Sequence, residues 1–138
     1  MPPTINYLAV LVCGVAAMVL GSLWYGPVFG KPWMKLMGYT EENMKSAKAK
    51  GGMWKLYALA FLGALVTAFV LAHFVSYVTP TTFSEGLQLG FWAWLGFIAT
   101  TLLGSVLWEQ RSWKLYFLNA AHHLVNLLVM STILTMWK

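Results

Sequence analysis

Four polar side chains stand close together in the last apolar stretch of this 138-residue chain. A helix turns 100° per residue, so Asn119, His122, His123 and Asn126 lie within about 100° of one another and form one polar face. Imidazole and amide groups bind ligands, carry protons or form hydrogen bonds. Because such groups are costly among apolar neighbours unless they are paired, we take this polar face as the candidate functional site.

The polar face supports three interpretations, which the sequence leaves open. The first is hydrogen bonding between helices, with Thr67, Thr100 and Thr101 as the nearest partners by depth. The second is proton transfer or the binding of a metal or haem. The third is a polar wall for a lipid or another small ligand.

We predict no cofactor, with haem as the alternative. His73 lies in a different apolar stretch, well toward its outer end, so we do not expect one metal ion to bind all three histidines. A haem needs only one or two imidazoles, which His122 or His123 would supply.

Other functional classes fit the composition poorly. We do not expect an enzyme. The chain contains no Asp, and no set of a Ser, a His and an acidic residue lies at one depth in the membrane. The single cysteine, Cys13, leaves no disulfide within the chain and is interpreted as a small packing residue. The net charge is +5, and the Lys and Arg residues that produce it flank the apolar stretches. This position favours contact with a membrane surface and not with nucleic acid.

The elements that position these residues follow from the distribution of charge. Hydrophobic residues make up 59% of the chain and charged residues 9%. Charged side chains are missing from residues 1–30, 56–84, 86–108 and 115–137. Because about 20 apolar residues in a helix cross a membrane, we predict an all-α integral membrane bundle of four transmembrane helices in a single domain, 1–138. The predicted spans are about 6–25, 54–77, 84–108 and 113–137.

The first connection is the longest hydrophilic segment. Gly26-Pro27 should end or kink the first span, because proline lacks the N–H that a continuing helix needs. The polar loop 31–53 follows, and within it Thr40 should cap a short interfacial or cytoplasmic helix that runs through Ala49.

The positive charges predict the orientation of the chain. Loops on the cytoplasmic side of a membrane carry the excess of Lys and Arg. Six lysines lie between Lys31 and Lys55, and the third connection holds Arg111 and Lys114, whereas the opposite side has only Lys138. We therefore predict that both termini lie outside and that the loop 31–53 is cytoplasmic.

Small residues recur at every fourth position and form smooth helix faces, which allow two helix backbones to approach closely. These helix-packing residues are Ala9, Cys13, Ala17 and Gly21 in the first span and Gly96, Thr100 and Gly104 in the third. They meet other helices either within the chain or between subunits. We predict a homo-oligomer or a subunit of a larger membrane complex in the lipid bilayer.

One motif carries a resemblance to a known family. The residues after the first span read Trp24-Tyr25-Gly26-Pro27-Val28-Phe29-Gly30-Lys31, and the last span contains Phe117-Leu118-Asn119-Ala120-Ala121. This pattern resembles a family of small bacterial four-span membrane proteins that is catalogued only as a domain of unknown function. The resemblance implies a multi-pass protein of the bacterial inner membrane, with no activity, cofactor or catalytic residue to carry over.

For the function, we predict a non-catalytic structural or accessory membrane protein that associates with itself or joins a larger complex. The alternative is a small transporter or a haem- or lipid-binding bundle that uses the polar face. A water-accessible cavity beside His122, Asn126 and Asn119 would favour the alternative, whereas a face saturated by neighbouring helices would favour the structural role.

Overall fold

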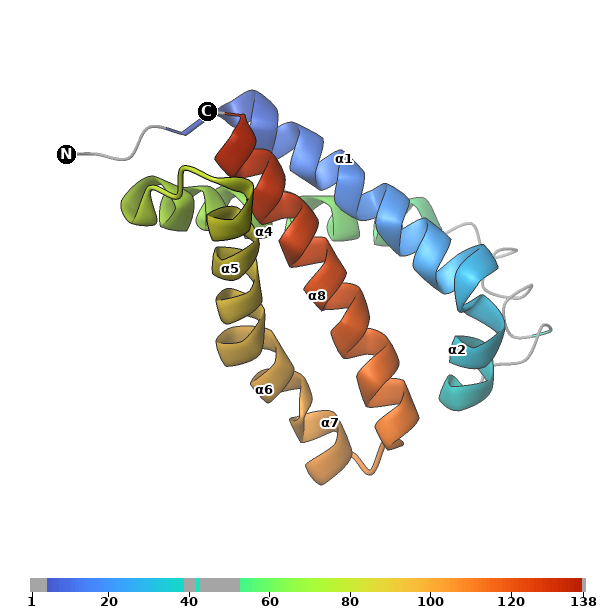
Figure 1. Ribbon diagram of the computed structural model, residues 1–138. Helices are drawn as coiled ribbons and strands as arrows, with labels where there is room; N and C mark the ends of the chain where they lie inside the picture. Colours follow the sequence, from blue (N-terminus) through green and yellow to red (C-terminus); the bar gives the residue numbers. More distant parts are fainter. Residues whose placement is uncertain (1–4, 39–41, 43–52, 138) are drawn as a thin grey trace.

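The computed structural model describes residues 5–38, 42 and 53–137, and these residues are mostly helical. Four helical segments are long and apolar enough to cross a membrane (Figure 1). They are Tyr7–Val28, Trp54–Val78, Phe83–Leu107 and Trp113–Met136. The all-α architecture with four spans is therefore confirmed, with bounds close to the predicted ones.

Several of these segments are assembled from consecutive helical elements. The elements are α1 (Tyr7–Leu23), the π-helical η1 (Trp24–Val28), α2 (Gly30–Met37), α4 (Met53–Val78), α5 (Phe83–Ala93), the π-helical η2 (Trp94–Ala99), α6 (Thr100–Leu102), α7 (Gly104–Leu107) and α8 (Trp113–Met136). The short helix predicted from Thr40 to Ala49 lies outside the described residues.

Polar side chains mark where three of the spans begin. The Asn6 side chain accepts a hydrogen bond from the N–H of Ala9 at 3.1 Å, and the Ser112 hydroxyl accepts one from Leu115 at 3.1 Å. Thr82 caps α5 in the same way. Each cap satisfies an N–H that has no partner within its helix, which fixes the first turn of the span.

The first span kinks where the sequence predicts a break. Gly26 has φ −109° and ψ −106°, outside the helical range, and Pro27 follows it inside η1. A Cβ at Gly30 would lie 2.8 Å from the carbonyl oxygen of Tyr25, so only glycine fits this close approach. The chain then continues as α2, which ends at Gly38 in the left-handed conformation, with φ 77°.

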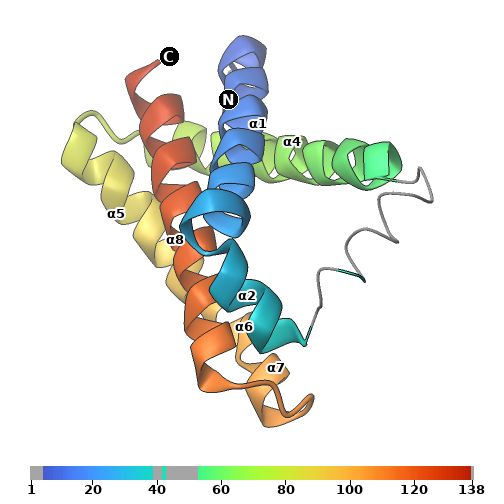
Figure 2. The same ribbon diagram turned by 90° about the vertical axis from the view of Figure 1, so that its right-hand side faces the viewer.

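Helix α8 is the centre of the fold. It packs against α1, α2, α4, α5 and η2, and the two views place it between α1 on one side and α5 on the other (Figures 1 and 2). Helix α4 crosses α1 and α8 steeply in both views, and its Met53 end lies away from α5, α6 and α7. Within the described residues, α4 makes fewer contacts with η2 and α6 than with α1 and α8.

The closely packed core lies at the end of the molecule that holds Asn6 and Trp137. There, small and branched side chains from α1, α4 and α8 are almost fully buried, namely Ala9, Val10, Cys13, Ala68, Leu71, Ala72, Val75, Leu127, Met130 and Leu134. Ala9 and Cys13 are 0% exposed. The first-span face therefore packs inside the chain at this end, while Ala17 and Gly21 are only half-buried farther along α1.

The third span uses a different small-residue face from the one we predicted. A Cβ on Gly86 would lie 2.7 Å from the hydroxyl of Thr135, and one on Gly90 would lie 2.9 Å from the carbonyl oxygen of Leu127. Gly86 and Gly90 thus let α5 approach the backbone of α8.

The predicted face, Gly96, Thr100 and Gly104, does not pack against another helix in the described part of the chain. A Cβ at Gly96 would have no neighbour within 4 Å, and one at Gly104 would meet only Trp108, one turn along the same span, at 3.7 Å. Thr100 is exposed and donates to the Gly96 carbonyl at 2.7 Å. Of the two alternatives for this face, only contact between subunits stays a prediction.

Candidate functional site

The polar face lies midway along α8 and points into the bundle. Asn119, His122, His123 and Asn126 are all half-buried. The tyrosine hydroxyl of Tyr25, on η1, donates a hydrogen bond to Oδ1 of Asn119 at 2.8 Å. One member of the face is therefore paired with a side chain of another span.

His122 lies among aromatic rings and lacks a hydrogen bond. Its ring centroid is 5.1 Å from that of Tyr25, 5.9 Å from that of Trp24 and 5.0 Å from that of His123. Both ring nitrogens of His122 are buried, and neither has a hydrogen-bond partner among the described residues. A neutral imidazole has one donor and one acceptor nitrogen, so both hydrogen-bonding capacities are unused.

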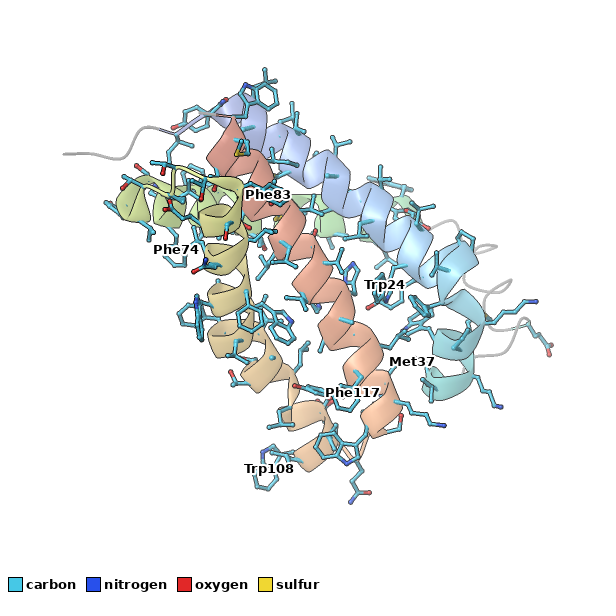
Figure 3. All side chains as sticks on the ribbon, viewed as in Figure 1. Trp24, Met37, Phe74, Phe83, Trp108 and Phe117 are labelled. Atoms are coloured by element: carbon cyan, nitrogen blue, oxygen red, sulfur yellow. The ribbon has the colours of Figure 1, made fainter. Side chains whose placement is uncertain are left out.

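Trp24 and Tyr25, the first two residues of η1, hold this region against α8. Trp24 lies between the kinked end of the first span and α8 (Figure 3), and its Nε1–H donates to the carbonyl oxygen of Leu118 at 3.2 Å. Tyr25 adds the hydrogen bond to Asn119 and a ring contact with Trp33 at 5.2 Å between centroids. From the sequence we used Trp24 and Tyr25 only as part of the family motif, and their part in the site was missed.

The hydroxyl partners proposed from the sequence bond elsewhere. Thr67 donates to the carbonyl oxygen of Gly63 at 3.0 Å, and Thr101 donates to that of Phe97 at 2.7 Å. Thr100 bonds within its own span in the same way. Threonine hydroxyls in helices commonly donate to a carbonyl oxygen of the preceding turn. These three threonines do so, and therefore they do not donate to the imidazole of His122.

A cavity of about 980 Å³ borders the polar face. We call it the central cavity. Its polar lining includes His122, His123 and Asn126 from α8 together with Thr67 from α4 and Thr101 from α6. Among the residues that the structure describes, no Lys, Arg, Asp or Glu lines it. The central cavity is therefore largely apolar, with a few hydrogen-bonding groups and no fixed charge.

Small residues and two π-helical segments make room for the central cavity. Gly21 and Gly63 line it, and a Cβ at Gly21 would come within 3.8 Å of Nε2 of His122. Segment η1 contributes Tyr25, and η2 contributes Phe97 and Ile98. Single π-helical turns within longer helices occur often at functional sites, because they break the regular hydrogen-bond ladder and redirect side chains.

His73 takes no part in the site. Its Nδ1 lies 2.8 Å from the carbonyl oxygen of Phe69 on its own helix, and its ring packs on the Phe69 ring at 4.7 Å. Within the described ranges, no group of three His, Cys, Asp or Glu side chains is close enough to hold a metal ion. Cys13 is buried in the core, with its sulfur 3.7 Å from the carbonyl oxygen of Met130.

The fold and the site define a four-helix membrane protein with a cavity beside its last helix, and the described lining of this cavity contains no charged side chain. The chain belongs to the family described as "Protein of unknown function (DUF1761)", which matches residues 8–135 and so covers nearly all of it. The resemblance to a four-span family of unknown function is thus confirmed. No curated protein and no solved structure matched the chain.

Proposed function

We propose that this protein binds a small, uncharged ligand in the central cavity, with His122 and Asn126 as its hydrogen-bonding groups. The observation that carries the proposal is His122, which lines a cavity of about 980 Å³ and whose two buried ring nitrogens have no hydrogen-bond partner among the described residues. An unsatisfied buried polar group costs about 1–3 kcal/mol, so a histidine kept in this state points to a partner that arrives from outside the chain.

The lining indicates the chemistry of the ligand. The cavity volume lies at the upper end of the range of about 300–1,000 Å³ that is typical of small-molecule sites. A charged ligand would meet no opposite charge among the described lining residues, and the burial of an unpaired charge is costly. The proposal therefore concerns an uncharged ligand that is bound without a catalytic step. Haem carries two charged propionates, so its ligation by His122 is an alternative to this proposal and not a form of it.

Two substitutions on α4 test the proposal. Ala60 and Ala58 are both exposed on the same helix, but only Ala60 lines the central cavity. We expect Ala60→Phe to fill part of the cavity and Ala58→Phe to leave it open. The measurement is solvent extraction and mass spectrometry of compounds that copurify with each variant in mild detergent.

A compound bound by the wild type and by Ala58→Phe, and lost from Ala60→Phe, is the expected result. Equal amounts in both variants, or no bound compound in the wild type, would contradict the proposal. Absorbance of the extracts in the Soret region separates haem from other ligands.

Self-association is a second candidate role. Gly96 and Thr100 stand exposed on the outer surface of the third span, and a Cβ at Gly96 would meet no described atom within 4 Å. A smooth helix face that the chain itself does not cover suits close contact with a helix of a second copy. This role is compatible with ligand binding, because Gly96 and Thr100 do not line the central cavity.

A further inference from the structure

The central cavity has one side that the described helices do not close. Helix α4 packs against α1 and α8, while η2 packs against α5, α6 and α8. Within the described residues, α4 makes no comparable contact with η2 or α6, although all three line the cavity. The space between α4 and the η2–α6 segment is therefore a side opening, which we call the lateral opening.

The rim of the lateral opening is apolar and aromatic. Tyr57 on α4 is 55% exposed and Phe97 on η2 is 68% exposed, and both line the cavity. Large apolar side chains at this level of exposure are stable in contact with acyl chains, so the lateral opening faces the hydrocarbon of the bilayer.

The hydrogen-bonding groups lie deep in the membrane. Helix α8 runs from Trp113 to Met136, so at 1.5 Å per residue His122 lies about 4 Å and Asn126 about 2 Å from its midpoint. A ligand that pairs with them brings its polar group to the middle of the bilayer. A charged head group is expensive there, whereas a carbonyl or hydroxyl pairs with a neutral imidazole and an amide.

We infer that the ligand is a neutral lipid with a carbonyl or hydroxyl head, and that it reaches the polar face through the lateral opening. This inference rests on the proposed function and names its ligand class. Two lipid types carry this chemistry: isoprenoid quinones or quinols, and diacylglycerols. Phospholipids do not fit, because their phosphate carries a charge.

Site-specific photo-crosslinking tests the inference in vesicles of phosphatidylcholine and phosphatidylglycerol with a decyl-tailed quinone and diacylglycerol added. A benzophenone amino acid replaces Phe97 at the rim in one variant and Trp92 in the control. Trp92 is 63% exposed on the same span and does not line the cavity. Mass spectrometry then gives the ratio of neutral-lipid to phospholipid adducts at each position.

We expect this ratio to be several-fold higher at Phe97 than at Trp92, and the adduct that accumulates identifies the quinone or the diacylglycerol as the source. Adding His122→Leu should lower the enrichment about tenfold, the effect of one lost hydrogen bond in an apolar site, while His122→Gln should retain most of it. Equal ratios at both positions would overturn the inference. An enrichment at Phe97 that His122→Leu leaves unchanged would also overturn it.

The two proposals fail in different ways. If Ala60→Phe removes a copurifying compound but the adducts at Phe97 match those at Trp92, the cavity binds a ligand of another class and only the present inference is wrong. If no compound depends on Ala60, the proposed function itself is wrong.

Discussion

At the residue scale, the polar face contains side chains in two different states. Asn119 accepts a hydrogen bond from Tyr25 at 2.8 Å, whereas both ring nitrogens of His122 are buried without a partner among the described residues. The two residues lie one helical turn apart, so depth and exposure do not explain the difference. Under the proposed function, Asn119 serves the structure and His122 serves the ligand.

This difference predicts opposite effects on stability in the ligand-free protein. His122→Leu should raise the free energy of unfolding by about 1 kcal/mol or more, because it removes two unsatisfied polar atoms. Asn119→Leu should lower it by about 1 kcal/mol, because it breaks the hydrogen bond from Tyr25. Thermal unfolding of delipidated protein in one detergent measures both.

A loss of stability for His122→Leu as large as that for Asn119→Leu would show that His122 has a structural partner. It would then remove the main observation behind the proposed function. A gain in stability with a loss of bound ligand is the pattern expected of a site that keeps a destabilising group for function.

At the scale of elements, two glycines decide how the third span lies against α8. Gly86 and Gly90 stand one turn apart on α5 and face Thr135 and Ser131. Because lipid is as apolar as a leucine side chain, helices in membranes associate through close backbone contact, and only glycine allows it here. The contact fixes α5 on one side of α8 and leaves the opposite side to α1 and α4.

The glycine contact predicts a sharp contrast between two alanine substitutions. Gly90→Ala should destabilise the protein, because its Cβ would lie 2.9 Å from the carbonyl oxygen of Leu127 and closer still to the Ser131 hydroxyl. Gly96→Ala should be neutral or stabilise by about 0.5–1 kcal/mol, because nothing lies within 4 Å and alanine favours helix. Melting temperatures in detergent compare the two. The contrast disappears if the third span packs through Gly96.

At the scale of the whole molecule, the bundle is tight at one end and open beside the middle of α8. The tight end holds the packed core around Cys13 and Met130. Exposed cations of α2, of the connection before α8 and of the first turn of α8 lie at the opposite end (Figure 1), namely Lys31, Lys35, Arg111 and Lys114. This gathering of positive charge at one end supports the proposed orientation, with that end in the cytoplasm.

The orientation predicts which ends of the spans face the cytoplasm. A reporter that is active only inside the cell should be active when it is inserted at Lys48 and inactive when it is fused after Lys138. The reason is that loops with an excess of Lys and Arg stay on the cytoplasmic side. Both positions lie outside the described residues. The reverse pattern would show that charge does not set the orientation of this chain.

The sequence determined the architecture and the membership of the polar face. Charge-free stretches of sufficient length predict four spans, and helical periodicity alone brings Asn119, His122 and Asn126 to one face. Gly26-Pro27 likewise predicts the kink, because proline's missing N–H is a local property. These features depend on composition and on contacts between near neighbours in the chain.

Only the tertiary structure decided which polar residue is paired and which is left over. The hydrogen bond from Tyr25 to Asn119 joins residues far apart in the sequence, and the choice of Gly86 and Gly90 over Gly96 depends on how α5 is rotated against α8. The central cavity exists because α4 diverges from the third span, which no single-helix pattern encodes. Most helix faces in a membrane are apolar and therefore alike, so the sequence shows which residues share a face, and only packing shows what that face meets.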